Sequence, residues 1–119
     1  MASMGSTPKD DQQKKEATLM KQLQEQTRSN IVNETVADII VNEVRTRYRK
    51  TGEKTSSYTR FDVEDIAKEV GGRSAFFKVS AWGVANVLNS IPGITAGYDD
   101  TSCQIGPCEW LEIIHIELN

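Results

Sequence analysis

The clearest hydrophobic pattern in the chain lies between Ile31 and Tyr48. Apolar residues recur there at every fourth position, which is the spacing of the buried face of an amphipathic helix: Val32, Val36, Ile40, Val44 and Tyr48. We expect Tyr48 to continue this face into the core. Ser29 or Asn30 is a suitable cap for the start of the helix, and Thr51-Gly52 ends it.

The segment before this helix is polar. Residues 10–28 are rich in Lys, Gln and Glu and contain neither Gly nor Pro, so the composition favours a helix that frays or extends. Leu19 and Leu23 share one face, but a single short stripe is too little for a coiled coil. We expect residues 1–28 to form a disordered arm and a polar helical extension, which becomes ordered in a homodimer, and residues 29–119 to form the folded domain.

Short elements follow this helix. Tyr58–Phe61 is rich in β-forming residues and predicts a strand. Asp62 is a good N-cap for a helix that ends at Gly71-Gly72. From Arg73 to Ile91 the spacing is again helical, and either one helix starts at Ser74 or a shorter helix is capped by Ser80; we favour the break.

The chain then becomes β-rich. Ile94–Tyr98 and Trp110–Leu118 predict two strands, joined by a polar loop with Gly106-Pro107. The fold class is therefore α+β. We expect one shared core made of Val36, Ile40, Val44, Ile66, Val84, Leu88, Ile113 and Ile116.

Residues 29–118 resemble the winged helix-turn-helix family. The resemblance rests on Ile66-Ala67, on Val84, Leu88 and Ile91, and on Gly93-Ile94. It implies a leading helix, a short strand, a helix-turn-helix and a C-terminal β-hairpin, with the second helix of the pair in the major groove of double-stranded DNA. The base-contacting residues would then be Lys78, Ser80, Trp82, Asn86 and Asn89. The alternative is an ordinary solvated helix face with Trp82 half-buried in the core.

Charge is unevenly distributed along the chain. The net charge is -3, yet residues 1–60 hold 11 Lys/Arg against 8 Asp/Glu, whereas residues 61–119 hold 3 against 9. A local basic cluster would contact phosphates or only complement the helix dipole. It consists of Arg45, Arg47, Arg49, Lys50, Lys54 and Arg60.

These patterns predict a DNA-binding transcriptional regulator or accessory protein that forms a homodimer. The alternative function is a protein-protein interaction module, an adaptor or inhibitor, that acts through an acidic β-face. Nucleic-acid binding requires the basic cluster to lie on the same side of the molecule as Lys78 and Asn86.

The remaining candidate chemistry is sparse. Cys103, Cys108 and the single His115 fall short of the four ligands of a structural zinc site, so no metal is expected. Neither a catalytic pair nor a glycine fingerprint is visible, so we expect neither an enzyme nor a cofactor. No apolar run reaches the roughly 18 residues that cross a bilayer, and we expect an intracellular protein with free thiols.

Overall fold

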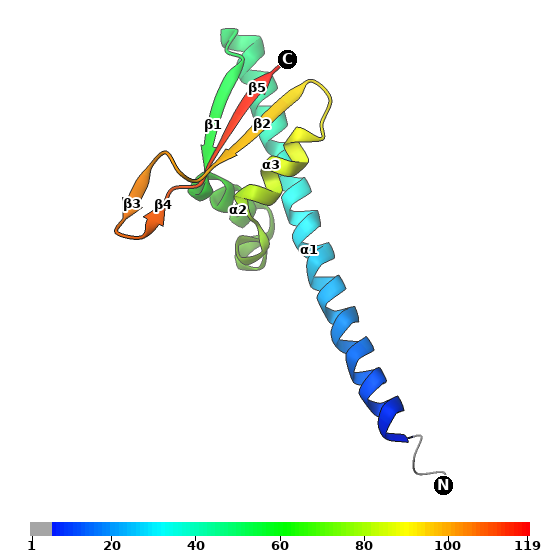
Figure 1. The fold of residues 1–119 in the computed structure, drawn as a ribbon. Coiled ribbons are helices and arrows are strands. Elements are labelled where there is room, and N and C mark those ends of the chain that lie inside the picture. Colours follow the sequence, from blue (N-terminus) through cyan, green and yellow to red (C-terminus); the bar gives the residue numbers. More distant parts are fainter. Residues whose placement is uncertain (1–5) are drawn as a thin grey trace.

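The protein consists of one long helix and a small α+β body packed on its C-terminal half (Figure 1). The computed structural model describes residues 6–119, with side chains from Gln13 onwards. The elements are α1 (Ser6–Thr51), β1 (Thr55–Thr59), α2 (Arg60–Lys78), α3 (Ala81–Asn89), β2 (Ile94–Asp99), β3 (Gln104–Gly106), β4 (Glu109–Trp110) and β5 (Ile113–Leu118).

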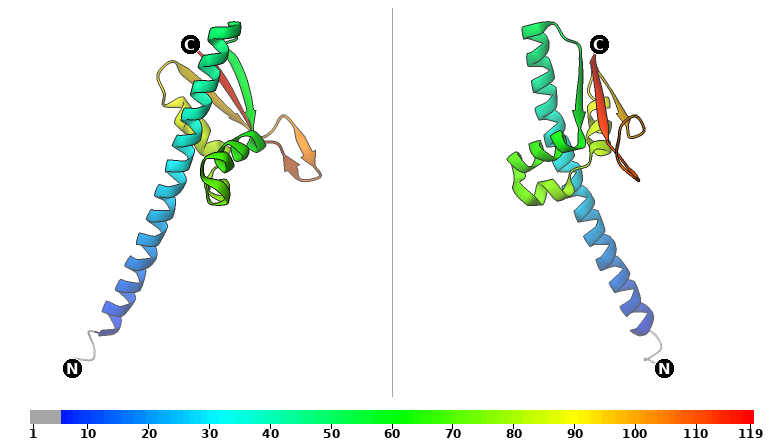
Figure 2. Two further views of the ribbon diagram at one scale, coloured as in Figure 1. Left: turned by 180° about the vertical axis from the view of Figure 1, so that it is seen from behind. Right: turned by 90° about the vertical axis from the view of Figure 1, so that its left-hand side faces the viewer.

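Helix α1 is continuous over 46 residues. The expected cap at Ser29 or Asn30 is wrong, because no Gly or Pro interrupts the chain between Pro8 and Gly52. Residues 13–28 are all exposed and project away from the body, as Figures 1 and 2 show. Gly52 ends the helix with a positive φ of 76°, and its N–H donates to the Tyr48 carbonyl at 2.8 Å. The expectation of disorder for residues 1–5 lies outside the described residues.

Helix α2 begins earlier than the sequence indicated. Thr59, not Asp62, is the N-cap: its hydroxyl accepts from the Asp62 N–H at 3.2 Å, and the Asp62 carboxylate accepts from the Thr59 N–H at 2.9 Å. This reciprocal capping box starts the helix at Arg60, so the preceding strand is Thr55–Thr59. Gly72, with φ 67° and ψ -155°, is not helical, so α2 consists of two helical segments that meet there at a kink, in agreement with the expected helix end at Gly71-Gly72.

The break before α3 is confirmed. Val79 is extended, and the Ser80 hydroxyl accepts from the Gly83 N–H at 3.0 Å, which caps a helix of 9 residues. The Ser80 N–H in turn donates to Asn33 Oδ1 on α1 at 3.0 Å. The buried Asn33 amide therefore fixes the start of α3 against α1.

The main sheet is antiparallel with the strand order β1-β5-β2. The expected strand Trp110–Leu118 is divided, because Trp110 belongs to the separate hairpin β3-β4, which projects from the link between β2 and β5 (Figure 1). The helices cover one face of the sheet, and the other face is open to solvent, as the right-hand view of Figure 2 shows.

The core lies between the helices and the inner face of the sheet. Of the eight residues expected there, six are buried and Ile66 packs against them partly exposed. Ile113 is the error: Ile114 and Ile116 face the helices, so the odd-numbered positions of β5 lie on the outer face. The expectation that Tyr48 continues the core is wrong, since Tyr48 is 42% exposed. Trp82 is 61% exposed, as expected for an outward residue and unlike the half-buried Trp82 of the alternative.

Candidate functional site

The basic residues at and after the end of α1 differ in how far they are exposed. Arg45, Arg49, Lys50 and Lys54 are exposed, whereas Arg47 is half-buried and donates to the Ser56 hydroxyl at 2.7 Å. Arg47 thus ties α1 to β1.

A second tie between α1 and β1 joins Tyr58 to Glu43. The Tyr58 hydroxyl donates to the Glu43 carboxylate at 2.8 Å. Burial and this bond raise the pKa of Tyr58 to about 12. The phenol therefore remains a hydrogen-bond donor at physiological pH. Glu43 and Arg47 on this side of α1 thus hold β1 against the helix.

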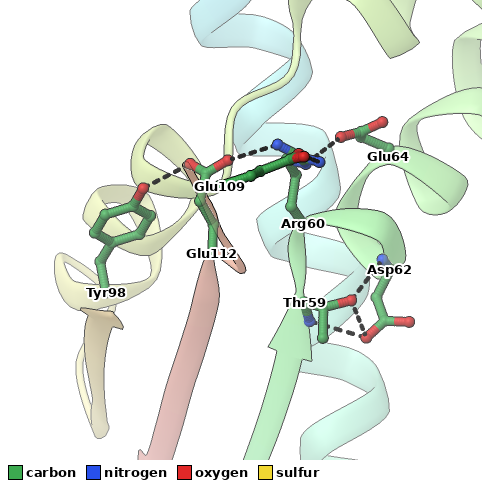
Figure 3. Close-up of polar contacts among 7 residues, drawn as sticks. All are labelled: Thr59, Arg60, Asp62, Glu64, Tyr98, Glu109 and Glu112. Atoms are coloured by element: carbon green, nitrogen blue, oxygen red, sulfur yellow. Dashed lines mark hydrogen bonds and ion pairs between the residues drawn. The ribbon is translucent and has the colours of Figure 1, made fainter. Parts of the chain in front are cut away.

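Arg60 has its charge compensated within the chain (Figure 3). Its guanidinium lies 3.2 Å from Glu64, 3.3 Å from Glu109 and 3.5 Å from Glu112. The contact of Nε with Glu64 is an ion pair without hydrogen-bond geometry. The group also lies 4.9 Å from the centre of the Phe61 ring. A guanidinium held by acidic partners is not presented to a phosphate, so we leave Arg60 out of any nucleic-acid surface.

The same cluster links the hairpin to the sheet. Glu112 accepts a hydrogen bond from the Tyr98 hydroxyl at 2.6 Å while it pairs with Arg60. Burial, followed by this bond, raises the pKa of Tyr98. Arg60, Glu109 and Glu112 therefore hold the base of the hairpin against the start of α2 (Figure 3).

Four of the five expected base-contacting residues lie on α3 or at its N-cap, and they divide into two groups. Ser80 and Asn89 have structural bonds: Ser80 caps α3, and Asn89 Oδ1 accepts from the Ala96 N–H on the edge of β2 at 3.2 Å. Trp82 and Asn86 lie four residues apart on the exposed face of α3. That face has no charge, because α3 contains no ionisable residue.

Lys78 and the basic end of α1 are not brought together. Lys78 lines a groove beside Arg28 and Ile31, and its ammonium donates to the Ser74 hydroxyl at 2.6 Å. Arg45 lies 14 residues beyond Ile31 on α1, which is about 20 Å along a helix axis. The basic cluster and Lys78 therefore occupy separate regions of the surface.

Sequence reasoning missed the apolar residues of the hairpin region. Ile105, Trp110 and Phe61 are 43%, 45% and 49% exposed. Ile105 and Trp110 lie on β3 and β4, and Phe61 follows Arg60, which is paired with Glu109 of β4. The signal in the sequence was Ile105, a large apolar residue in a segment that otherwise reads as a polar loop, whereas Phe61 and Trp110 stood in expected strands.

The open face of the sheet carries a Ser–His–Asp set that sequence spacing did not reveal. The register places Ser57 opposite His115, with 3.1 Å between the Ser57 hydroxyl and Nδ1. His115 Nε2 lies 3.6 Å from Asp99. Hydrogen bonds from the Ser102 hydroxyl and the Thr101 N–H lower the pKa of Asp99 to about 2.

This set joins the three strands across their open face. The His115 side chain is 56% exposed, so solvent reaches the group that would have to activate the serine. Catalysis by such a set also needs donors fixed around a developing oxyanion in a water-excluded site. We therefore assign the set a structural role.

Cys103 and Cys108 are exposed free thiols. Within the described residues, no three His, Cys, Asp or Glu side chains are grouped so that they could hold a metal ion. No helix in the described part of the chain is long and apolar enough to span a bilayer. No family model, curated protein or solved structure matches this chain.

Proposed function

We propose that this chain is a winged-helix protein-interaction module, an adaptor or inhibitor, rather than a DNA-binding one. The order of its elements supports a winged-helix arrangement. A leading helix, a strand and two helices are followed by β2 and β5 of the same sheet with the hairpin β3-β4 between them, and β1 lies at one edge of the sheet with β5 in its centre. In that arrangement α3 occupies the position of the recognition helix, and the segment between β2 and β5 is the wing.

One observation carries the choice between protein and DNA. Residues 79–119 contain no Lys or Arg and include Asp99, Asp100, Glu109, Glu112 and Glu117. This range includes α3 and the wing, the two elements that a winged helix would present to DNA, and Asp100, Glu109 and Glu112 lie in the wing. A surface that binds a polyanion is basic, so α3 would offer phosphates no cation and the acidic wing would repel them.

The exposed side chains on the same elements suit a protein partner. Trp82 on α3 and Trp110 on the hairpin are 61% and 45% exposed. Tryptophan is among the residues that most often dominate the energy of protein interfaces. Trp110 stands in a segment that also carries Asp100, Glu109 and Glu112, and such carboxylates are complementary to a partner with basic residues.

The experiment places a photo-crosslinking amino acid at Ile105 and incubates the chain with an extract of the source cells. We expect one defined protein to be crosslinked, and we expect Trp110→Ala or Asp100→Lys to abolish the product. The matched control carries the photo-crosslinking amino acid at the exposed Lys68 of α2 and should give no such product. Absence of any product at Ile105 would contradict the proposal.

A titration with duplex and single-stranded DNA at two salt concentrations tests the rival function. Salt-sensitive binding that Arg45→Ala and Arg49→Ala weaken would replace the proposal with nucleic-acid binding at the end of α1, because each lost phosphate contact lowers the salt dependence. We expect no binding at tens of micromolar protein.

A further inference from the structure

An apolar groove lies between α1 and α2. Two adjoining hollows, of about 250 Å³ and about 170 Å³, share the same wall residues: Ile31, Val32, Gly71 and Ala75. Val70 completes the smaller hollow. Ile31 and Val70 are 55% and 52% exposed although they belong to apolar walls. The groove thus offers apolar surface that the chain itself does not cover.

The glycine pair of α2 forms this groove. Gly71 belongs to the wall of both hollows, and a Cβ there would come within 2.7 Å of the Ala75 Cβ. Gly72 adopts φ 67° and redirects the second half of α2, which carries Ala75 and Lys78. Only a residue without a side chain allows this close approach and this bend, so the shape of the groove depends on both glycines.

The rim of the groove is basic, unlike the wing. Arg28 on α1 and Lys78 on α2 both line the larger hollow. The hydrogen bond from the Lys78 ammonium to the Ser74 hydroxyl holds this charge at the rim. Apolar walls between two cations are complementary to an apolar side chain that has carboxylates beside it.

We propose that this groove binds an amphipathic helical segment of a partner protein, one in which an aliphatic side chain is flanked by Asp or Glu. The aliphatic side chain enters the hollows between Ile31 and Val70, and the carboxylates pair with Arg28 and Lys78. Helices commonly bind in this way, with their apolar face in a groove. The groove is distinct from the α3 and hairpin surface, so this proposal and the proposed function can fail separately.

Charge argues against the N-terminal extension of a second copy as the occupant. Residues 13–28 present apolar side chains, but they include Lys14, Lys15, Lys21 and Arg28 against Glu16 and Glu25. A net positive segment would meet the positive rim, and like charges at an interface are unfavourable. An acidic segment of a different protein avoids this repulsion.

The test uses two fluorescein-labelled peptides of about twelve residues, each with leucines spaced to form one helical face. One peptide has Glu beside the leucines and the other has Lys. We expect the full chain to bind the Glu peptide more tightly than the Lys peptide. The double variant Arg28→Glu/Lys78→Glu should weaken binding of the Glu peptide roughly tenfold and reverse the preference. Val70→Ser should weaken both peptides, because it replaces apolar wall by a hydroxyl.

The matched control is Arg45→Glu/Lys68→Glu, which changes the net charge equally at exposed positions outside the groove. It should leave the preference between the peptides unchanged. Thermal melts of all variants establish that each is folded. Equal binding of the two peptides, no binding of either, or an effect of the control as large as that of the rim variant would overturn the proposal. A dimer of the full chain that the rim variant alone disperses would also overturn it, because a second copy would then be the occupant.

Discussion

At the scale of single residues, Arg60 has a different role in the fold from the one that its sequence position suggested. In the sequence, Arg60 is the last residue of a basic cluster that was expected to contact phosphates. In the fold it starts α2, and its guanidinium is placed between carboxylates of α2 and of the hairpin segment (Figure 3). Its side chain is 30% exposed, so its ion pairs are screened less than those of a fully exposed side chain.

Replacing Arg60 by methionine should destabilise the protein by about 1–2 kcal/mol. Methionine retains much of the side-chain length but leaves Glu64, Glu109 and Glu112 near one another without a cation. Urea denaturation at low and high salt measures the effect, and the deficit should shrink as salt rises. Lys68→Met, at an exposed position on the same helix, is the control and should change little. An equal loss of stability in both variants would show that the ion pairs of Arg60 contribute nothing.

Asp99→Asn should remove a pH-dependent part of the stability. The folded protein holds the pKa of Asp99 at about 2, below its ordinary value of 3.8, because the carboxylate accepts bonds from Ser102 and Thr101. A lowered pKa in the folded state stabilises the protein above the unfolded value, and this contribution disappears as the pH falls from about 4 towards 2. Urea denaturation should therefore show wild type more stable than Asp99→Asn at pH 6, with a difference that shrinks as the pH falls below about 4 and vanishes only below about 2. A difference that does not change with pH would contradict this account.

At the scale of elements, β5 decides which side chains form the core. It is the central strand, and its register with β1 and β2 fixes one face towards the helices. A shift of one residue would reverse every side chain. Ile114 is 0% exposed on the inner face, and its neighbour Ile113 is on the outer face.

The adjacent pair Ile114 and Ile113 therefore allows a direct test of the register. Ile114→Ala should lower the free energy of unfolding by about 2–5 kcal/mol, the usual cost of truncating a buried aliphatic side chain. Ile113→Ala should cost less than about 1 kcal/mol. Ile40→Ala and Leu88→Ala, both at 0% exposed positions, should fall in the larger range. Thermal or urea denaturation measures all four variants. A similar loss of stability in Ile113→Ala and Ile114→Ala would contradict the register described for β5.

The same pair shows what the sequence could specify. Helical periodicity identified the buried positions of α1 and α3, because a helical repeat over many residues is a strong signal. In β5 the run Ile113-Ile114-His115-Ile116 fits either face, and only pairing with β1 and β2 selects one. The capping residue of α2 was missed because Thr59 and Asp62 are both good caps, and their mutual bonds place the boundary.

The surfaces were less predictable than the core. The sequence indicated which residues are basic, but Arg47 and Arg60 bind side chains of the same chain. Lys78 on α2 lies beside Arg28 and Ile31, far from the end of α1 that carries Arg45. The groove between α1 and α2 joins Ile31 to Val70, which are distant in sequence and share no motif. Such contacts depend on how helices pack, and no local pattern specifies them.

At the scale of the whole molecule, the protein is far from compact. Its radius of gyration is 19.9 Å and its extents are 76 × 36 × 26 Å, whereas a compact chain of this length would have a radius near 13.5 Å. The difference comes from the N-terminal half of α1, which projects beyond the body (Figure 2). Leu19, Met20 and Leu23 on this projection are each more than half exposed.

Removing residues 1–28 should leave the body intact. Because every described side chain from 13 to 28 is exposed, the free energy of unfolding should change by less than about 0.5 kcal/mol. Urea denaturation tests this, and a large loss of stability would mean that the extension packs on the body in solution.

The extension should instead determine self-association. Most helical stability in proteins comes from packing of an apolar face, and the apolar side chains of the extension gain from burial against a second copy, so we keep the prediction of a homodimer formed by paired extensions. Few apolar residues per chain and the net positive charge of the segment make the pair weak, so sedimentation should show a dimer only at high protein concentration and a monomer after truncation. Leu19→Glu/Leu23→Glu in the full chain should have the same effect as truncation, whereas Lys21→Glu, which lies off that face and lowers the positive charge, should not disperse the dimer. A full chain that sediments as a monomer at every concentration would rule out the homodimer, and a dimer that survives truncation would move the contact to the body.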